Sequence, residues 1–163
     1  MRIVANSSVL IALSSIEQLE LLKQCFDEDI LIPNAVWDEV VVTGKGRAGA
    51  ETVRTTAWLK RHAVQDTDYV HFLCADLDKG EAEAIVLARE LKADIVLLDE
   101  KAARSIADRL GLHVLGTVGL LIWARRQNLI PSLREQLDTL RHKGRFRLSQ
   151  KLYRAALAEV GEI

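Results

Sequence analysis

The sequence has few of the residues that carry the most easily recognised chemistry. Its two cysteines, Cys25 and Cys74, are isolated, so neither a disulfide framework nor a thiolate metal site is expected. The four histidines are scattered without the spacing of zinc ligands. The G-x-S-x-G motif and the Walker lysine motif are also missing. These absences set aside zinc chemistry, serine hydrolases of that type and P-loop proteins.

Long hydrophobic runs are missing as well. The longest apolar stretches, such as residues 119–124, are far too short to span a bilayer. No signal-peptide region precedes the first strand-like segment, which begins at Ile3. We therefore expect a cytoplasmic protein that makes no contact with a membrane.

The composition is that of an ordinary globular protein, with 49% hydrophobic and 28% charged residues in 163. This length favours one domain, 1–163, with a C-terminal helical extension from about residue 129. The net charge of −1 is unevenly distributed: residues 1–119 carry −6 and residues 120–163 carry +5. The pattern fits an acidic pocket beside a basic surface for nucleic acid or an acidic partner. A solvated pair of amphipathic helices explains the basic segment equally well.

Strands and helices alternate along the first 116 residues. This alternation predicts a three-layer α/β/α sandwich, in which helices cover both faces of a short parallel sheet. Expected strands are 3–5, 29–32, 63–64, 94–98 and 113–115. Expected helices are 7–13, from 15 to about 26, 33–39, from the glycine-rich loop to about 61, 81–92, 101–110, 117–128, 131–142 and 149–160.

Polar side chains stand where several of these segments meet. Asn6 and Asp99 end apolar strands, Glu39 lies on the helix after Pro33, and Glu83 lies near the start of the helix after Gly80. Ligands of open α/β sheets bind at the carboxyl ends of the strands, so these side chains are expected to converge. Clustered oxygen ligands suit Mg²⁺ or Mn²⁺, which activates water and neutralises charge developing on phosphate oxygens.

Some of these residues have structural explanations as well. Glu81 and Glu83 point about 200° apart on a helix, so we expect one of them, Glu83, to bind the metal directly. Glu81 then either binds through water or complements the helix dipole. Asp99 alternatively caps the following helix.

Three further residues are expected to bind substrate. Ser8 would lie within the pocket, and Lys101 and Arg104 follow Asp99 closely enough to meet a phosphate. Ser8 alternatively caps its helix. The two basic residues are alternatively ordinary exposed charges.

Residues 44–49 match the dinucleotide-binding pattern G-x-G-x-x-G. That interpretation requires residues 40–42 to form a strand, with an acid ending a strand about twenty residues further on. Residues 33–39 instead favour a helix running into the loop, and no strand-ending acid follows at that distance. We therefore do not expect a nucleotide cofactor.

Taken together, these segments resemble the PIN domain, and in particular the PIN-like branch of predicted nucleic-acid-binding proteins. The similarity lies in 6–11, 32–39, 77–85 and 97–99, with weaker matches at 116–121 and 146–149. The resemblance implies a Mg²⁺- or Mn²⁺-dependent endoribonuclease acting on single-stranded RNA. It also implies a toxin with a partner antitoxin and a homodimer.

Carried over by position, the resemblance assigns Glu39, Glu83 and Asp99 as catalytic metal ligands, with Glu81 as an additional acid. Asn6 occupies the place of the usual first Asp. An amide oxygen can bind Mg²⁺, but it carries no charge and cannot act as a base. Asn6 therefore supports an alternative function, a catalytically weak PIN-like module that binds nucleic acid or a protein partner.

Overall fold

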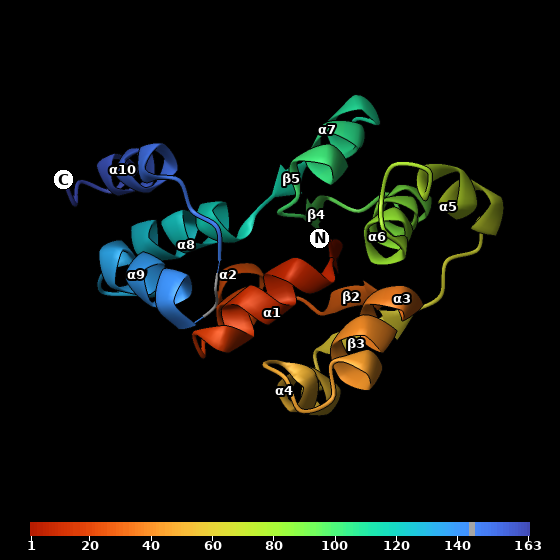
Figure 1. Ribbon diagram of the computed structural model, residues 1–163, viewed down its shortest axis with the longest axis horizontal. Coiled ribbons are helices and arrows are strands. Elements are labelled where there is room, and N and C mark those ends of the chain that lie inside the picture. The colour runs from red at the N-terminus through yellow and green to blue at the C-terminus, as the bar shows by residue number, and fades with distance from the viewer. Residues whose placement is uncertain (144–145) are drawn as a thin grey trace.

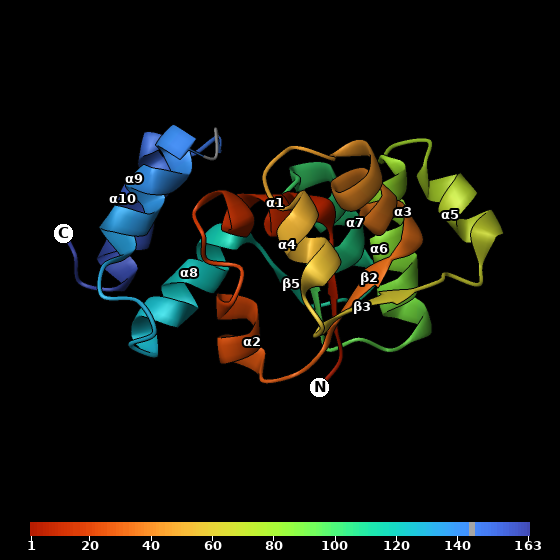
Figure 2. The same ribbon diagram turned by 90° about the horizontal axis from the view of Figure 1, so that it is seen from below.

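The computed structural model describes residues 1–143 and 146–163. Five short parallel strands form one sheet in the order β3-β2-β1-β4-β5, and helices cover both of its faces (Figures 1 and 2). This confirms the predicted α/β/α sandwich. The strands are β1 (Ile3–Ala5), β2 (Ile30–Pro33), β3 (Leu59–His62), β4 (Ile95–Leu97) and β5 (Val114–Leu115). The helices are α1 (Ser7–Ser15), α2 (Leu21–Phe26), α3 (Asn34–Trp37), the π-helix η1 (Asp38–Thr43), α4 (Ala50–Thr55), α5 (Thr67–Leu73), α6 (Lys79–Glu90), α7 (Lys101–Arg109), α8 (Thr117–Arg126), α9 (Leu133–Lys143) and α10 (Gln150–Glu159).

The central strands divide their side chains between two hydrophobic cores. Ile3 and Ala5 of β1 belong to the core formed with α1, α2 and the C-terminal helices, whereas Val4 belongs to the core formed with α5, α6 and α7. Val96 and Leu97 of β4 divide in the same way. Successive side chains of a strand point to opposite faces, so a sheet covered on both sides needs apolar residues at every position.

The C-terminal helices α8, α9 and α10 lie together at one end of the molecule, beside α1 and α2 (Figures 1 and 2). Leu120, Leu137 and Leu157 are fully buried in the core that these helices share with α1 and α2. No helix among the described residues is long and apolar enough to cross a membrane.

Several predicted boundaries are wrong. The second helix begins at Leu21 rather than Ser15, because Ser15 ends α1 and its hydroxyl donates to the Ala12 carbonyl at 2.6 Å. The helix after the glycine-rich loop ends at Thr55, and β3 occupies 59–62 rather than 63–64 because it pairs in register with β2. Helix α5 is an element that the sequence pattern does not predict.

Glu162 ties the end of the chain to α8 and α9. Its carboxylate accepts hydrogen bonds from the backbone N–H groups of Leu133 (2.7 Å) and Arg134 (3.1 Å), from the Ser132 hydroxyl (3.1 Å) and from Arg125 Nε (3.2 Å). Partial burial alone would raise the pKa of Glu162, but these hydrogen bonds outweigh burial and hold the pKa below its usual value.

Replacing Glu162 by Ala is expected to lower the free energy of unfolding by about 1–3 kcal/mol, because it leaves charged and backbone donors without their acceptor. A depressed carboxylate pKa stabilises the fold above the unfolded-state value, so the difference between wild type and variant should disappear as the pH falls through the folded-state pKa. Urea denaturation at pH 7 and in acid measures both effects. Glu159→Ala is the matched control because the Glu159 side chain forms an exposed ion pair with Arg126, worth at most about 1 kcal/mol. Equal losses in the two variants would contradict this account.

Candidate metal and phosphodiester site

Asn6 and Asp99 are brought together by the pairing of β1 with β4. Ala5 is the register partner of Leu97, and the backbone N–H of Asn6 donates to the Leu97 carbonyl at 3.1 Å. Both side chains therefore lie at the carboxyl edge of the sheet. Asn6 is 3% exposed and is the residue before the first turn of α1, although its side chain makes no capping hydrogen bond.

Glu39 reaches the same edge from η1. Its Oε2 atom accepts a hydrogen bond of 2.8 Å from the Ser7 hydroxyl, which also lies 3.3 Å from Asn6 Oδ1. A Cβ atom added to Gly80 would lie 3.1 Å from Glu39 Oε2 and 3.3 Å from Asn6 Oδ1. The absence of a side chain at Gly80 thus lets α6 begin directly against these two oxygens.

Glu81 faces this group from the first turn of α6. It forms a capping box with Asp78: Asp78 Oδ1 accepts from the Glu81 N–H at 2.7 Å, and Glu81 Oε1 accepts from the Asp78 N–H at 3.1 Å. Glu81 is only 6% exposed. Burial raises its pKa, and repulsion by Asp78, Glu100 and Glu39 raises the pKa further, against the lowering effect of the Asp78 backbone hydrogen bond.

Glu83 points elsewhere. Its Oε1 atom accepts a hydrogen bond of 2.9 Å from the backbone N–H of Ala35, at the start of α3, and Glu83 does not line the pocket that contains the other acids. The structure therefore turns Glu81 into the pocket and Glu83 toward the start of α3, whereas the sequence favoured Glu83 as the direct ligand. The separation of about 200° between the two side chains is a property of any helix, but it does not say which of them faces the pocket. The capping box with Asp78 decides this by turning Glu81 inward.

Asp99 is held by the start of α8. Its Oδ1 accepts from the Thr117 N–H and its Oδ2 from the Thr117 hydroxyl, each at 2.7 Å. Burial raises the pKa of Asp99 above its usual value. The two Thr117 hydrogen bonds and the nearby Arg104 lower the pKa, but not enough to offset burial. Asp99 does contact a helix N-terminus, but that helix is α8 and not α7, the helix that directly follows it.

A pocket of about 570 Å³ joins these side chains, and we call it the acidic pocket. Asn6, Glu39, Glu81 and Asp99 all line it, as do Asp78 and Glu100. Ser8 also lines it, and its hydroxyl oxygen is buried without a hydrogen-bond partner among the described residues. Four separate segments thus direct oxygen atoms into one space.

The basic residues of the pocket are not the ones expected. Lys101 is exposed at the start of α7 and is not part of the lining. Arg104 donates from Nη1 to the Leu98 carbonyl at 3.0 Å and does not line the acidic pocket. Arg147 does line it, together with Phe146. Sequence reasoning missed both because no local pattern places the segment before α10 against β1 and β4.

The donor chemistry of the acidic pocket fits a hard divalent cation. Its side chains offer carboxylate and amide oxygens, which Mg²⁺ and Mn²⁺ prefer, and a cation would relieve the repulsion that raises the pKa of Glu81. Within the described residues, however, no three Asp, Glu, His or Cys side chains form a group that could hold a metal ion as they stand.

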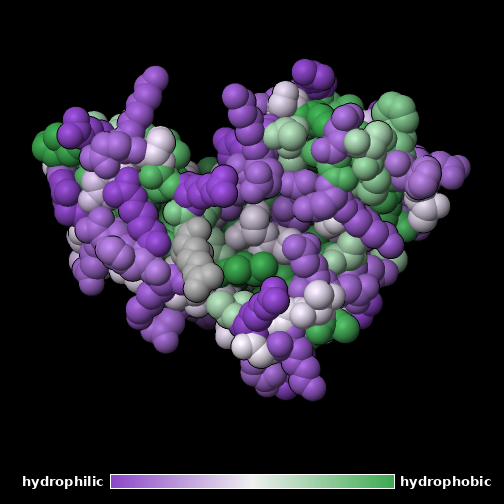
Figure 3. Space-filling view, viewed as in Figure 1, coloured by the Kyte–Doolittle hydropathy of each residue, from purple (hydrophilic) through white to green (hydrophobic). Residues whose placement is uncertain are grey.

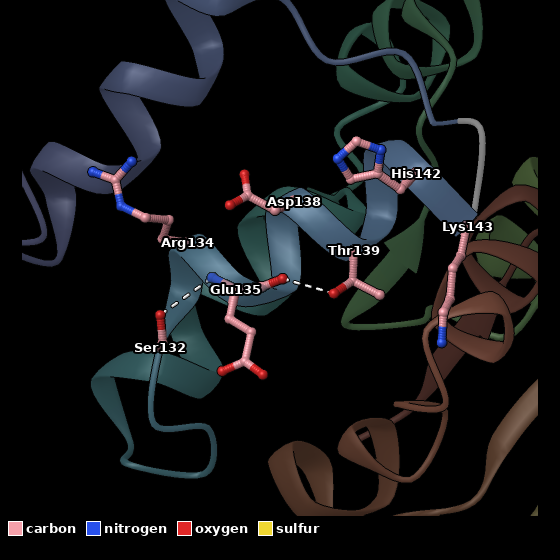
Figure 4. A pocket seen from close by; sticks show the side chains of 7 residues that line it. All are labelled: Ser132, Arg134, Glu135, Asp138, Thr139, His142 and Lys143. Atoms are coloured by element: carbon pink, nitrogen blue, oxygen red, sulfur yellow. Dashed lines mark hydrogen bonds between the residues drawn. The ribbon is translucent and has the colours of Figure 1, made fainter.

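A second hollow, of about 430 Å³, runs along α9 and is lined by Ser132, Arg134, Glu135, Asp138, Thr139, His142 and Lys143 (Figure 4). Ser132 and Thr139 bond to the backbone of Glu135, and the side chains of Glu135 and Asp138 point away from each other (Figure 4). The two carboxylates do not converge, so this hollow does not gather a reactive group.

The structure is a short parallel sheet, covered by helices, whose carboxyl edge carries an acidic pocket. Residues 2–162 match the family model of the PIN domain. The chain therefore belongs to the PIN domain family, which confirms the resemblance seen in the sequence. No curated protein and no solved structure matches the chain. Residues 40–42 belong to η1, so they do not form the strand that a dinucleotide-binding interpretation of the glycine-rich loop requires.

Proposed function

We propose that this protein is a metal-dependent endoribonuclease of the PIN type and the toxin of a toxin–antitoxin pair. The observation that carries the proposal is the convergence of Asn6, Glu39, Glu81 and Asp99 on one pocket of about 570 Å³. Membership of the PIN family supports nuclease chemistry and nucleic acid as the ligand class. The toxin role, the antitoxin, the homodimer and the cytoplasmic location rest on the family resemblance alone.

In this proposal Glu39, Glu81 and Asp99 hold Mg²⁺ or Mn²⁺, with Asn6 as a neutral ligand. The bound cation lowers the pKa of water and neutralises charge on the phosphodiester. Hydrogen bonds orient the three carboxylates: the Ser7 hydroxyl orients Glu39, the Asp78 N–H orients Glu81, and Thr117 orients Asp99. Arg147, which lines the pocket, supplies positive charge for a phosphate.

Titration calorimetry of Mn²⁺ into the wild-type protein tests the proposal before any substrate is known. We expect saturable binding that Asp99→Asn abolishes, since the Asn side chain keeps an acceptor for the Thr117 N–H but loses the charge. Cleavage of labelled single-stranded RNA in Mn²⁺ should stop when EDTA is added. Cleavage that continues in EDTA, or Mn²⁺ binding that is unchanged in Asp99→Asn, would refute the proposal.

One observation favours a second function, a catalytically weak PIN-like module that binds nucleic acid or a protein partner. Asn6 removes one negative charge from the site, and among the described residues no group of three acids is assembled for a metal ion. This alternative requires RNA binding that persists in EDTA and weakens with salt. Wild-type protein that binds RNA but takes up no Mn²⁺ would favour it.

A further inference from the structure

A second cavity, of about 440 Å³, adjoins the acidic pocket. The two share Asp99, Phe146 and Arg147 as lining residues, so a ligand can occupy both at once. The cavity lies between α7 and β5 on one side and α8 and α10 on the other. The space-filling view shows a notch between α10 and α7 (Figure 3). Its volume is within the range of small-ligand sites, about 300–1,000 Å³.

The walls of this cavity differ from those of the acidic pocket. Apolar side chains predominate: Val114, Leu115, Val118, Ile122, Phe146 and Leu152. Two arginines, Arg104 and Arg147, add positive charge. Apolar walls with one aromatic ring and a few donors suit a flat, heteroaromatic group better than they suit a sugar or a free anion.

Gly116 leaves room for the Arg104 guanidinium beside this cavity. A Cβ atom at this position would lie 2.6 Å from Arg104 Nη1 and 3.0 Å from Asp99 Oδ1. The guanidinium can therefore cross the start of α8 and donate to the Leu98 carbonyl at 3.0 Å. A guanidinium has five N–H donors, so the donors that this bond does not use can bind acceptors on a ligand.

We propose that this cavity, which we call the base pocket, holds one unpaired nucleobase of a single-stranded RNA whose adjacent phosphate lies in the acidic pocket. The proposal rests on the function proposed above. Phe146 provides the stacking surface, and Arg104 provides donors for the edge of the base. Arg147 lines both cavities and stands where the phosphate between base and scissile bond would pass.

The base pocket restricts the substrate. A base in a duplex is stacked and paired, so only an unpaired nucleotide can enter a separate cavity beside the cleavage point. The site would then select single-stranded segments through one base rather than through the backbone alone. Charge complementarity supports this ligand over an apolar peptide, because the two arginines suit a phosphate-linked base.

The test is equilibrium binding of fluorescently labelled strands in Ca²⁺, a cation that oxygen ligands also bind, so that the charge of the acidic pocket is neutralised. Gel electrophoresis after each titration checks that the strands are intact. The probes are an oligoadenylate RNA and a strand of the same length built from abasic ribose phosphates. We expect the wild-type protein to bind oligoadenylate at least about fivefold more tightly than the abasic strand, since one stacked base contributes roughly this much or more.

Phe146→Leu keeps an apolar side chain against the core but removes the stacking surface. It is expected to lose this preference, with little change for the abasic strand. Phe72→Leu is the control, because Phe72 is 73% exposed on α5, away from both cavities. Leu152→Ala, on the rim at the start of α10, provides a second variant should Phe146→Leu prove unstable. It should also weaken oligoadenylate selectively.

Equal binding of the two strands by the wild-type protein would overturn the base pocket, and so would equal weakening of both strands by Phe146→Leu. The proposed function fails separately. Base-dependent binding without cleavage in Mn²⁺ would support the base pocket and contradict the proposed nuclease activity. Metal-dependent cleavage without any preference for the oligoadenylate strand would support the nuclease activity and contradict the base pocket.

Discussion

Replacing Glu81 by Gln is expected to abolish detectable Mn²⁺ binding and to lower the rate of RNA cleavage by about 100-fold or more. Substitutions around metal ligands already cost about 10–100-fold, and a direct ligand should cost at least as much. The Gln side chain retains the acceptor that closes the capping box on the Asp78 N–H, so α6 should still begin at the same residue. The measurements are Mn²⁺ calorimetry and initial cleavage rates at saturating metal.

The stability of Glu81→Gln separates a functional loss from a folding defect. Burial and neighbouring acids raise the pKa of Glu81, so its charged form is less favourable in the folded than in the unfolded protein. An acid with a raised folded-state pKa lowers stability at neutral pH. The melting temperature of the metal-free variant should therefore equal or exceed that of the wild type.

Glu83→Gln is the matched control, because it removes the same charge two residues further along the same helix. The amide oxygen of the new side chain can still accept from the Ala35 N–H, so the start of α3 is preserved. Mn²⁺ affinity and cleavage should stay within about threefold of wild type, the spread expected for a substitution outside the site. Loss of both activities in Glu83→Gln, with Glu81→Gln unaffected, would restore the arrangement expected from the sequence.

The fold is largely predictable because its central strands β1 and β4 are apolar at every position and strands alternate with helices. The sequences of β1 and β4 indicate buried strands, and the structure places their side chains in two cores. Boundaries that are set by pairing with another strand are harder to predict from the sequence. The position of β3 is fixed by pairing with β2, since Leu59 is the register partner of Ile30. The residues of β3 alone do not indicate that register.

The site shows the same division between local and distant information. The positions of Asn6 and Asp99 follow from where two parallel strands end, and this can be anticipated from the chain. The inward direction of Glu81 depends on a capping box that is visible in the sequence as Asp78-x-x-Glu81. The contacts of Asp99 with Thr117 and the approach of Arg147 require tertiary pairing, so sequence alone does not give them.

By the resemblance to the PIN domain, Asn6 stands at the place of an Asp, and Asn6→Asp tests what the missing charge does. The carboxylate created would lie beside Glu39, because Glu39 Oε2 and Asn6 Oδ1 both lie within 3.3 Å of the position that a Cβ atom at Gly80 would occupy. Two carboxylates this close repel each other unless a cation lies between them. We therefore expect a lower melting temperature in EDTA and Mn²⁺ binding at least about tenfold tighter than wild type, roughly 1.4 kcal/mol.

The two changes should appear together in thermal denaturation. Because Mn²⁺ binds the folded state, tighter binding should give Asn6→Asp a larger rise in melting temperature between EDTA and saturating Mn²⁺ than the wild type shows. Asn34→Asp is the matched control, because it adds the same charge at α3, where Asn34 accepts from Arg61 Nε at 2.7 Å. Its response to Mn²⁺ should equal that of the wild type. If Asn6→Asp alters neither the metal-free melting temperature nor the response to Mn²⁺, the missing charge at residue 6 is not what limits metal binding.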